Sequence, residues 1–262
     1  LYDLPAAPRR DMNDHLIAAG GRALVAGTYY IGIYNGSTDL PATTTLERRG
    51  IGAGRIIPIQ DLSFSAGTAV TISNLAPRQA VYYKVTVPPN TAGWEFSLEP
   101  SAGEMMLAVR RGAIPDHLVG DNVNLQETSS NSVRQTKIQK TGGERYLLLP
   151  ENNQVSLLEG DYYIAVVSEG QNPPASNVIG SGPSSGTFTN HGPLTVQDLG
   201  TATASGLIQS VSLAGAQVKA YQFTVPAGTA SLELRLDNRT GNPLMALISG
   251  LGIPQADTTI FT

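Results

Sequence analysis

The sequence of 262 residues contains no cysteine, which excludes disulfide bonds and thiolate metal sites. Its 17 basic and 21 acidic residues give a net charge of −4, so no basic surface for nucleic acid is expected. No apolar run approaches the roughly 18 residues of a membrane span, and no signal-peptide pattern is visible. We therefore expect a chain with no bound cofactor that neither binds nucleic acid nor inserts into a membrane.

Helix signals are also scarce. The best candidate covers residues 13–25, where Gly20 and Gly21 interrupt the pattern, and we expect no more than a turn or two there. The 28 glycines and 17 prolines instead favour turns and short strands.

An internal repeat is the most informative feature that is present. Residues 27–33 (GTYYIGI) return as 160–166 (GDYYIAV), 133 positions later. Three further landmarks recur in the same order, at offsets of 137, 138 and 138: IQDL at 59–62 as VQDL at 196–199, YKVTVP at 83–88 as YQFTVP at 221–226, and WEFSL at 94–98 as LELRL at 232–236. One repeat unit is thus about 135 residues, the size of a single domain.

The phase of the repeat divides the chain into one whole unit and two partial ones. Residues 1–65 are predicted to be the C-terminal part of a first unit plus a linker, and 66–205 a complete unit plus a linker. Residues 206–262 are predicted to be the N-terminal part of a further unit. The sequence starts at Leu1 without an initiator methionine, which points to a segment processed or cut from something longer.

The repeated segments alternate apolar and polar side chains with a period of two. Tyr83, Val85 and Val87 alternate with Lys84 and Thr86, and residues 221–225 keep the same parity. Residues 94–98 and 232–236 also keep their apolar positions while the polar ones change, as one buried face requires. With weaker strands near 70–72, 145–149 and 211–213, the pattern predicts an all-β chain of tandem antiparallel β-sandwich domains.

These strands resemble the bacterial pre-peptidase C-terminal domain. The resemblance rests on residues 81–88, on 94–98, on 106–115 and, after a variable stretch, on 160–166. That family implies a jelly-roll-like β-sandwich, carried by secreted proteases and found in tandem in large surface proteins, and collagen-binding modules of clostridial collagenases are similar to it. Neither linker here has the dense acidic cluster through which those relatives hold calcium, so calcium dependence is not carried over.

Two glycine-rich motifs invite an enzymatic interpretation. Residues 182–186 (GPSSG) fit the pattern of a nucleophile elbow, with His191 close behind, but residues 187–193 lack the helical period that an elbow needs. Residues 50–54 (GIGAG) resemble a phosphate-binding loop, yet an extended segment follows instead of a helix. We interpret both as linker, the first an interdomain loop, and predict no enzymatic activity.

The remaining candidate ligands are weak. His15 and His117 each lie in Asp-His-Leu but at non-equivalent places in the repeat, and Asp116, Asp121 and Asn122 lack the spacing of a calcium cage, so no metal is predicted. By parity four tyrosines face outward from their strands, either as a binding face or as cross-strand partners: Tyr30, Tyr34, Tyr82 and Tyr163.

Two segments rich in glycine, proline, serine and threonine, at about 36–58 and 168–195, read as linkers between sandwiches. The first functional hypothesis is a non-enzymatic structural repeat module of a large extracellular or cell-surface protein. The alternative is a module that binds collagen, another extracellular matrix protein or glycan and accompanies a secreted peptidase.

The phase of the repeat also predicts how copies associate. Each partial unit exposes a row of apolar side chains: Tyr29, Ile31 and Ile33 in the first, and Val225, Leu232, Leu234 and Leu236 in the last. The front half of one copy is expected to close with the back half of the next, either between separate chains or within a continuous repetitive polypeptide. Because such a head-to-tail contact does not close on itself, it propagates as a filament.

Overall fold

The computed structural model describes residues 26–28, 56–77, 79–115, 135–138, 141–150, 154–171, 180–215, 217–250 and 252–254. Every regular element in these ranges is a strand, so this part of the chain has no helix that could span a membrane. The strands are β1 Ile59–Leu62, β2 Thr68–Leu75, β3 Ala80–Val87, β4 Trp94–Ala102, β5 Glu104–Arg111, β6 Gln135–Ile138, β7 Glu144–Leu148, β8 Gly160–Gly170, β9 Ser184–Pro193, β10 Val196–Thr201 and β11 Ala220–Thr224.

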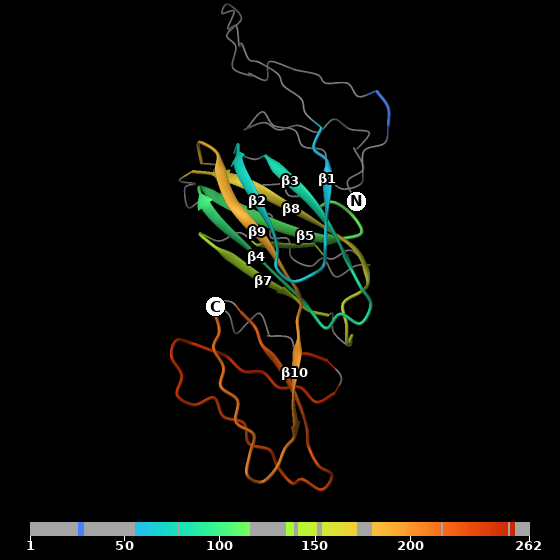
Figure 1. The fold of residues 1–262 in the computed structure, drawn as a ribbon, viewed down its shortest axis with the longest axis vertical. Helices are drawn as coiled ribbons and strands as arrows, with labels where there is room; N and C mark the ends of the chain where they lie inside the picture. Colours follow the sequence, from blue (N-terminus) through green and yellow to red (C-terminus); the bar gives the residue numbers. More distant parts are fainter. Residues whose placement is uncertain are drawn as a thin grey trace, which may run out of the picture.

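Two sheets pack face to face in the upper body of Figure 1. One has the strand order β1-β3-β8-β5-β6 and the other the order β2-β9-β4-β7. Every pairing within them is antiparallel except that of β1 with β3, which is parallel. The predicted β-sandwich is confirmed, and the parallel edge strand is an addition to it.

The core between the sheets is built by the alternation seen in the sequence. Val85, Val87, Trp94, Phe96 and Leu98 are at most 1% exposed. The Trp94 ring lies 4.7 Å from that of Phe96, and its Nε1 donates a hydrogen bond of 2.7 Å to the buried Oδ1 of Asn190. The strand parity that was read from the repeat is therefore correct for β3 and β4.

The outer face of the five-stranded sheet carries a second apolar cluster. Tyr82 is buried there at 5% exposure, with Ala108 and Ala165, and the half-buried Tyr163 packs against them. Tyr82 and Tyr163 therefore lie on the outward face, as parity predicted, but the alternative of an open aromatic binding face is wrong for Tyr82, which this cluster covers. Tyr30 and Tyr34 lie outside the described residues.

Strand pairing changes the predicted linkers and boundaries. Residues 168–195 are not a linker, because β8 extends to Gly170 and β9, a central strand of the second sheet, spans Ser184–Pro193. β1 pairs with β3, and β10 pairs with β11, so β1 and β10 are each the first strand of the unit that follows. Both units therefore begin several residues before the boundaries at 65 and 205 that the sequence predicted. The complete unit below therefore means residues 59–193, and the partial unit means residues 196–250.

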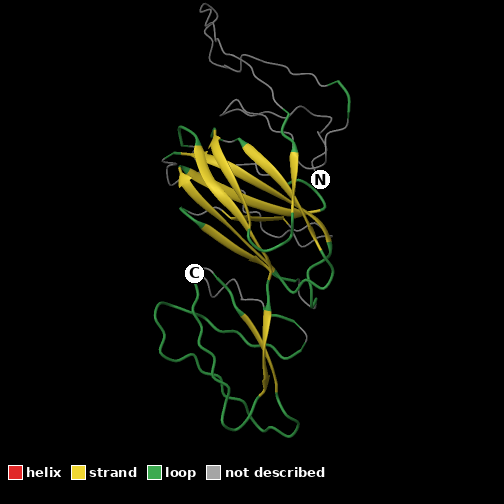
Figure 2. Ribbon diagram, viewed as in Figure 1, coloured by secondary structure: helices red, strands yellow, loops and turns green. Residues whose placement is uncertain are grey.

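Figure 2 shows that the partial unit, below the sandwich, is mostly loop in conformation. Its strands among the described residues are β10 and β11. Of its predicted strands only β11 forms, whereas residues 211–213 and 232–236 join no sheet. Residues 245–247, which correspond to part of β5, join no sheet either. The expected helix at 13–25 and most of the first predicted linker lie outside the described residues.

We predict that Phe96→Ala lowers the free energy of unfolding by about 3 to 5 kcal/mol, because it leaves a cavity beneath Trp94. Glu99→Ala, at an exposed position of the same strand, should cost under about 0.5 kcal/mol. Urea unfolding followed by the emission of Trp94, the only tryptophan, measures both. Equal small effects would contradict the packing described for β4. Glu95 is a poorer control than sequence parity indicated, because it forms an ion pair of 2.9 Å with Arg145.

Candidate assembly interface

The partial unit repeats the start of the complete unit strand for strand. In the complete unit Ile59 pairs with Tyr82 across β1 and β3, and in the partial unit Val196 pairs with Ala220 across β10 and β11. Both ladders are parallel, and the residues paired are those that the sequence repeat equates. The β10–β11 ladder thus repeats the register of the β1–β3 ladder.

The turns of the complete unit recur as well. The amide of Gln79 donates to the carbonyl of Ala76 at 2.9 Å, and that of Gln217 donates to the carbonyl of Ala214 at 3.1 Å. Three backbone positions with positive φ also recur at the offset of 138: Asn90 (59°) as Gly228 (77°), Gly103 (66°) as Gly241 (76°), and Gly112 (75°) as Gly250 (130°). The backbone of the partial unit thus turns at the positions that correspond to these turns of the complete unit.

Topology explains why its other segments are not strands. In the complete unit β1 and β3 are the only pair among β1 to β5 that share a ladder. β3 and β5 are bridged by β8, and β2 and β4 by β9. The partial unit holds the equivalents of β1 to β5 alone, so only the β10–β11 ladder forms within it.

The apolar side chains that would face a core are consequently open to solvent. Val225, Leu232 and Leu234 are 43%, 42% and 39% exposed, whereas their counterparts Val87, Trp94 and Phe96 are at most 1% exposed. Leu236, the fourth predicted interface residue on this side, is half-buried. The same face carries Leu213, Met245 and Leu247 at 41%, 53% and 58% exposure.

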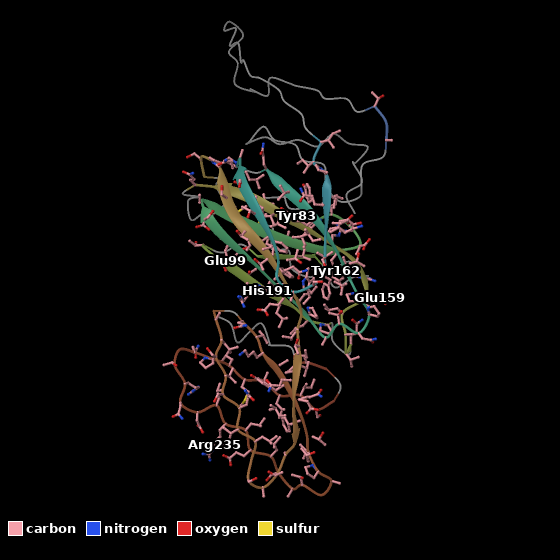
Figure 3. The ribbon with its side chains drawn as sticks, viewed as in Figure 1. Tyr83, Glu99, Glu159, Tyr162, His191 and Arg235 are labelled. Carbon is pink, nitrogen blue, oxygen red and sulfur yellow. The ribbon has the colours of Figure 1, made fainter. Side chains whose placement is uncertain are left out.

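Figure 3 contrasts the two environments: Tyr83 and Tyr162 lie inside the sandwich, whereas Arg235 lies on the open lower body. Burial raises the pKa of the Tyr83 hydroxyl to about 12. In the partial unit, where residues 232–236 join no sheet, Arg235 forms an ion pair with Glu233, two residues away. In the complete unit the corresponding Glu95 reaches across to Arg145 of β7, a strand that the partial unit lacks.

The other predicted interface residues, Tyr29, Ile31 and Ile33, lie outside the described residues. The adjoining residues 26–28, blue in Figure 1, lie beyond the end of the sandwich that is opposite to the partial unit.

Ser184 and His191, the candidates for a nucleophile and its base, occupy opposite ends of β9. They are seven residue steps apart along the strand, which is about 23 Å. Ser184 is fully buried, and its Oγ donates to the carbonyl of Glu104 at 2.7 Å and contacts Ser168 Oγ at 2.8 Å. The GPSSG motif is therefore the start of a strand and not a nucleophile elbow, and the interpretation as an interdomain loop is wrong as well.

His191 serves the sheet instead. Its Nε2 lies 2.8 Å from Ser97 Oγ on the neighbouring strand β4. Burial, and next to it the positive charge of Arg145, lowers the pKa of the imidazole, while Glu95 and Glu99 oppose that shift. These contacts stabilise the β4–β9 pairing with a neutral histidine.

The described residues contain no group of three or more His, Cys, Asp or Glu side chains that could hold a metal ion. The histidine and acidic candidates at 15 and 116–122, and the glycine-rich residues 50–54, lie outside the described ranges.

Sequence reasoning missed β9 because only Phe188 on its inward face is a large apolar residue. The other buried positions there are Ser184, Gly186, Asn190 and Gly192. Gly186 and Gly192 have to be small, since a Cβ at either would lie 2.8 Å from backbone atoms of Glu99 or Ala66. A strand selected for close approach carries little hydrophobic periodicity.

No protein-family model and no curated protein matches the sequence. Among solved structures, the 1.0 Å crystal structure of the pre-peptidase C-terminal domain of collagenase from Bacillus anthracis matches 53% of this chain and 97% of that chain, with 12% identity and a TM-score of 0.28. That structure is of the domain type that the strands of this chain resemble in sequence.

We predict that the monomer shows two classes of hydrogen exchange. Amides of residues 232–236 and 245–248 should exchange at least about a hundredfold faster than those of Leu98 and Val109, because they have no ladder partner. Mass spectrometry of peptides at a concentration where the chain is monomeric tests this. Equal protection in the two units of the monomer would contradict the open face.

We also predict that stability falls as the pH falls below 6.5, the ordinary pKa of histidine. The pKa of His191 is lower in the folded chain than in the unfolded chain, so at acidic pH the unfolded chain binds a proton more readily. His191 therefore lowers the stability of the fold as the pH falls below 6.5, and has no such effect at higher pH. His191→Gln should flatten the dependence of unfolding free energy on pH between about 7 and 5. Identical profiles for both proteins would show that His191 does not couple proton binding to folding.

Proposed function

We propose that this chain is a non-enzymatic structural repeat module of a large extracellular or cell-surface protein, and that copies assemble head to tail into a filament. The front half-unit of one copy is completed by the back half-unit of the next. The observation that carries the proposal is the partial unit, which has the strand register and turns of the complete unit but leaves Val225, Leu232 and Leu234 exposed.

Physical chemistry supports association over an isolated monomer. A contiguous apolar face of this kind is uncommon on a soluble monomer and marks an interaction surface. Each large side chain that moves from water into a core contributes about 1.5 to 3 kcal/mol. Segments 211–213, 232–236 and 245–248 join no sheet, and this adds a directional requirement, because an added strand can pair with their backbone groups in series.

The alternative, a collagen- or glycan-binding module of a secreted peptidase, rests on the family resemblance. Among the described residues the aromatic surface that would have favoured it is reduced, because Tyr82 is buried. The extracellular location is part of both proposals.

We predict concentration-dependent assembly, visible as a rising mass in light scattering and as filaments of uniform width in negative-stain electron microscopy. Leu234→Asp should weaken the association by on the order of a hundredfold, because it places a charge at a position that assembly buries. Glu233→Gln, on the opposite face of the same segment, is the matched control and should assemble normally.

The Trp94 unfolding transition of both variants should equal that of the unmodified chain, since the complete unit is untouched. A chain that stays monomeric at every concentration, or a Leu234→Asp variant that assembles like the unmodified chain, would refute the proposal.

A further inference from the structure

The partial unit lacks the strand that would join its two ends. In the complete unit β8 lies between β3 and β5 and pairs with both. In the partial unit β11 stands for β3 and residues 242–249 stand for β5, and no described strand lies between them. Building on the proposed function, we infer that residues 27–33 of a second copy enter this position as an antiparallel strand, in the register of β8.

The register follows from the complete unit. On one side Lys84 pairs with Tyr163 and Thr86 with Asp161, and on the other Val109 pairs with Ile164. Carried over by the repeat offsets, these pairs become Gln222 with Tyr30, Thr224 with Thr28, and Leu247 with Ile31.

The inward side chains of the inferred strand match the open face. Ile164, fully buried, is paired with Tyr83 and Val109. Ile31 would occupy the same place between Tyr221 and Leu247, the second of which is 58% exposed. The inferred strand therefore covers part of the face that the partial unit leaves open.

The outward positions match in size. In the complete unit the small Ala165 is paired with Tyr82 and Ala108. The corresponding Gly32 would lie between Ala220 and Ala246, so both neighbours are small. Nothing bulky opposes the close approach of three backbones at this point.

Charges change together on the two sides of the inferred interface. In the complete unit Lys84 forms an ion pair of 2.9 Å with Asp61 and lies 4.0 Å from Asp161 of β8. The repeat replaces Lys84 by Gln222 and Asp161 by Thr28. Had only the lysine been lost, Asp198, which corresponds to Asp61, would face a second carboxylate without a cation. The loss of both partners fits strands that pair with each other.

Engineered disulfides test the register, because the chain has no cysteine of its own. The matched variant carries Gln222→Cys and Tyr30→Cys, which the inferred register makes direct neighbours, at a Cα separation of about 4.5 to 5.5 Å. The control carries Thr224→Cys and Tyr34→Cys, which are six residues out of register and lie about 20 Å apart along the strands.

The full-length variants are oxidised at a concentration where the chain assembles, with equal amounts of isotopically light and heavy protein. We expect the matched variant to form a ladder of covalent multimers at least about tenfold faster than the control. Mass spectrometry should find the disulfide joining light and heavy chains. The Trp94 unfolding transition verifies that both variants keep the complete unit folded.

The other outcomes overturn the inference in distinguishable ways. A disulfide that forms only within one chain would rule out a second copy as the source of the strand. Equal crosslinking of both variants, or none in a preparation that forms filaments, would refute the register and leave the proposed assembly standing. If neither crosslinks nor filaments form, the proposed function fails as well.

Discussion

The architecture depends on one constraint: the strands that hold both sheets together come last in the unit. β8 lies at the centre of one sheet and pairs with β3 and β5, and β9 lies within the other and pairs with β2 and β4. Without them, β2 loses its only partner, and β3, β4 and β5 each lose one of two. Among the first five strands themselves, only β1 and β3 pair with each other. Backbone groups that lose a sheet partner have to find another or remain in water. The front half of a unit can therefore form its turns from its own sequence, but its two sheets are completed only when the strands of a back half pair with it.

The partial unit is a physical example of that separation between local and non-local structure. Its turns are local: the hydrogen bond from Thr229 Oγ1 to the carbonyl of Pro226, 2.7 Å, repeats that from Thr91 to Pro88, 2.8 Å. Its sheets are non-local, and apart from the β10–β11 ladder they do not form. A segment whose turns are already set loses less conformational entropy when a partner strand arrives, so the preformed bends favour association. Burial of the exposed apolar residues then supplies the driving force for association, and pairing with the incoming strands sets its geometry.

Much of this was predictable from the sequence because the repeat shows each pattern twice. Conserved parity at residues 83–87 and 94–98 identified the buried face, and Trp94 and Phe96 are indeed fully buried. The failures have physical causes. β9 uses glycines for close packing, so it lacked hydrophobic alternation, and its sequence was read as a linker. Tyr82 is covered by a second cluster on the outer face of the sheet, which a period of two does not reveal. The boundary was misplaced because β1 and β10 are short strands that pair in parallel with a strand well along the chain. β1 pairs with β3 beyond the intervening β2, and β10 pairs with β11 beyond residues 202–219.

Complementation of this kind sets the polarity of the proposed assembly. The open front face and the 27–33 strand are different surfaces, so the contact is heterologous and each added copy presents the same unfilled face again. Complete and shared sandwiches would then alternate along the filament. The β9-to-β10 junction fixes how they follow each other: only Leu194 and Thr195 separate the two strands, and the amide of Leu194 donates to the carbonyl of Gly93 at 2.8 Å. A junction this short limits the relative rotation of neighbouring sandwiches, which favours a regular filament over a loosely tethered string.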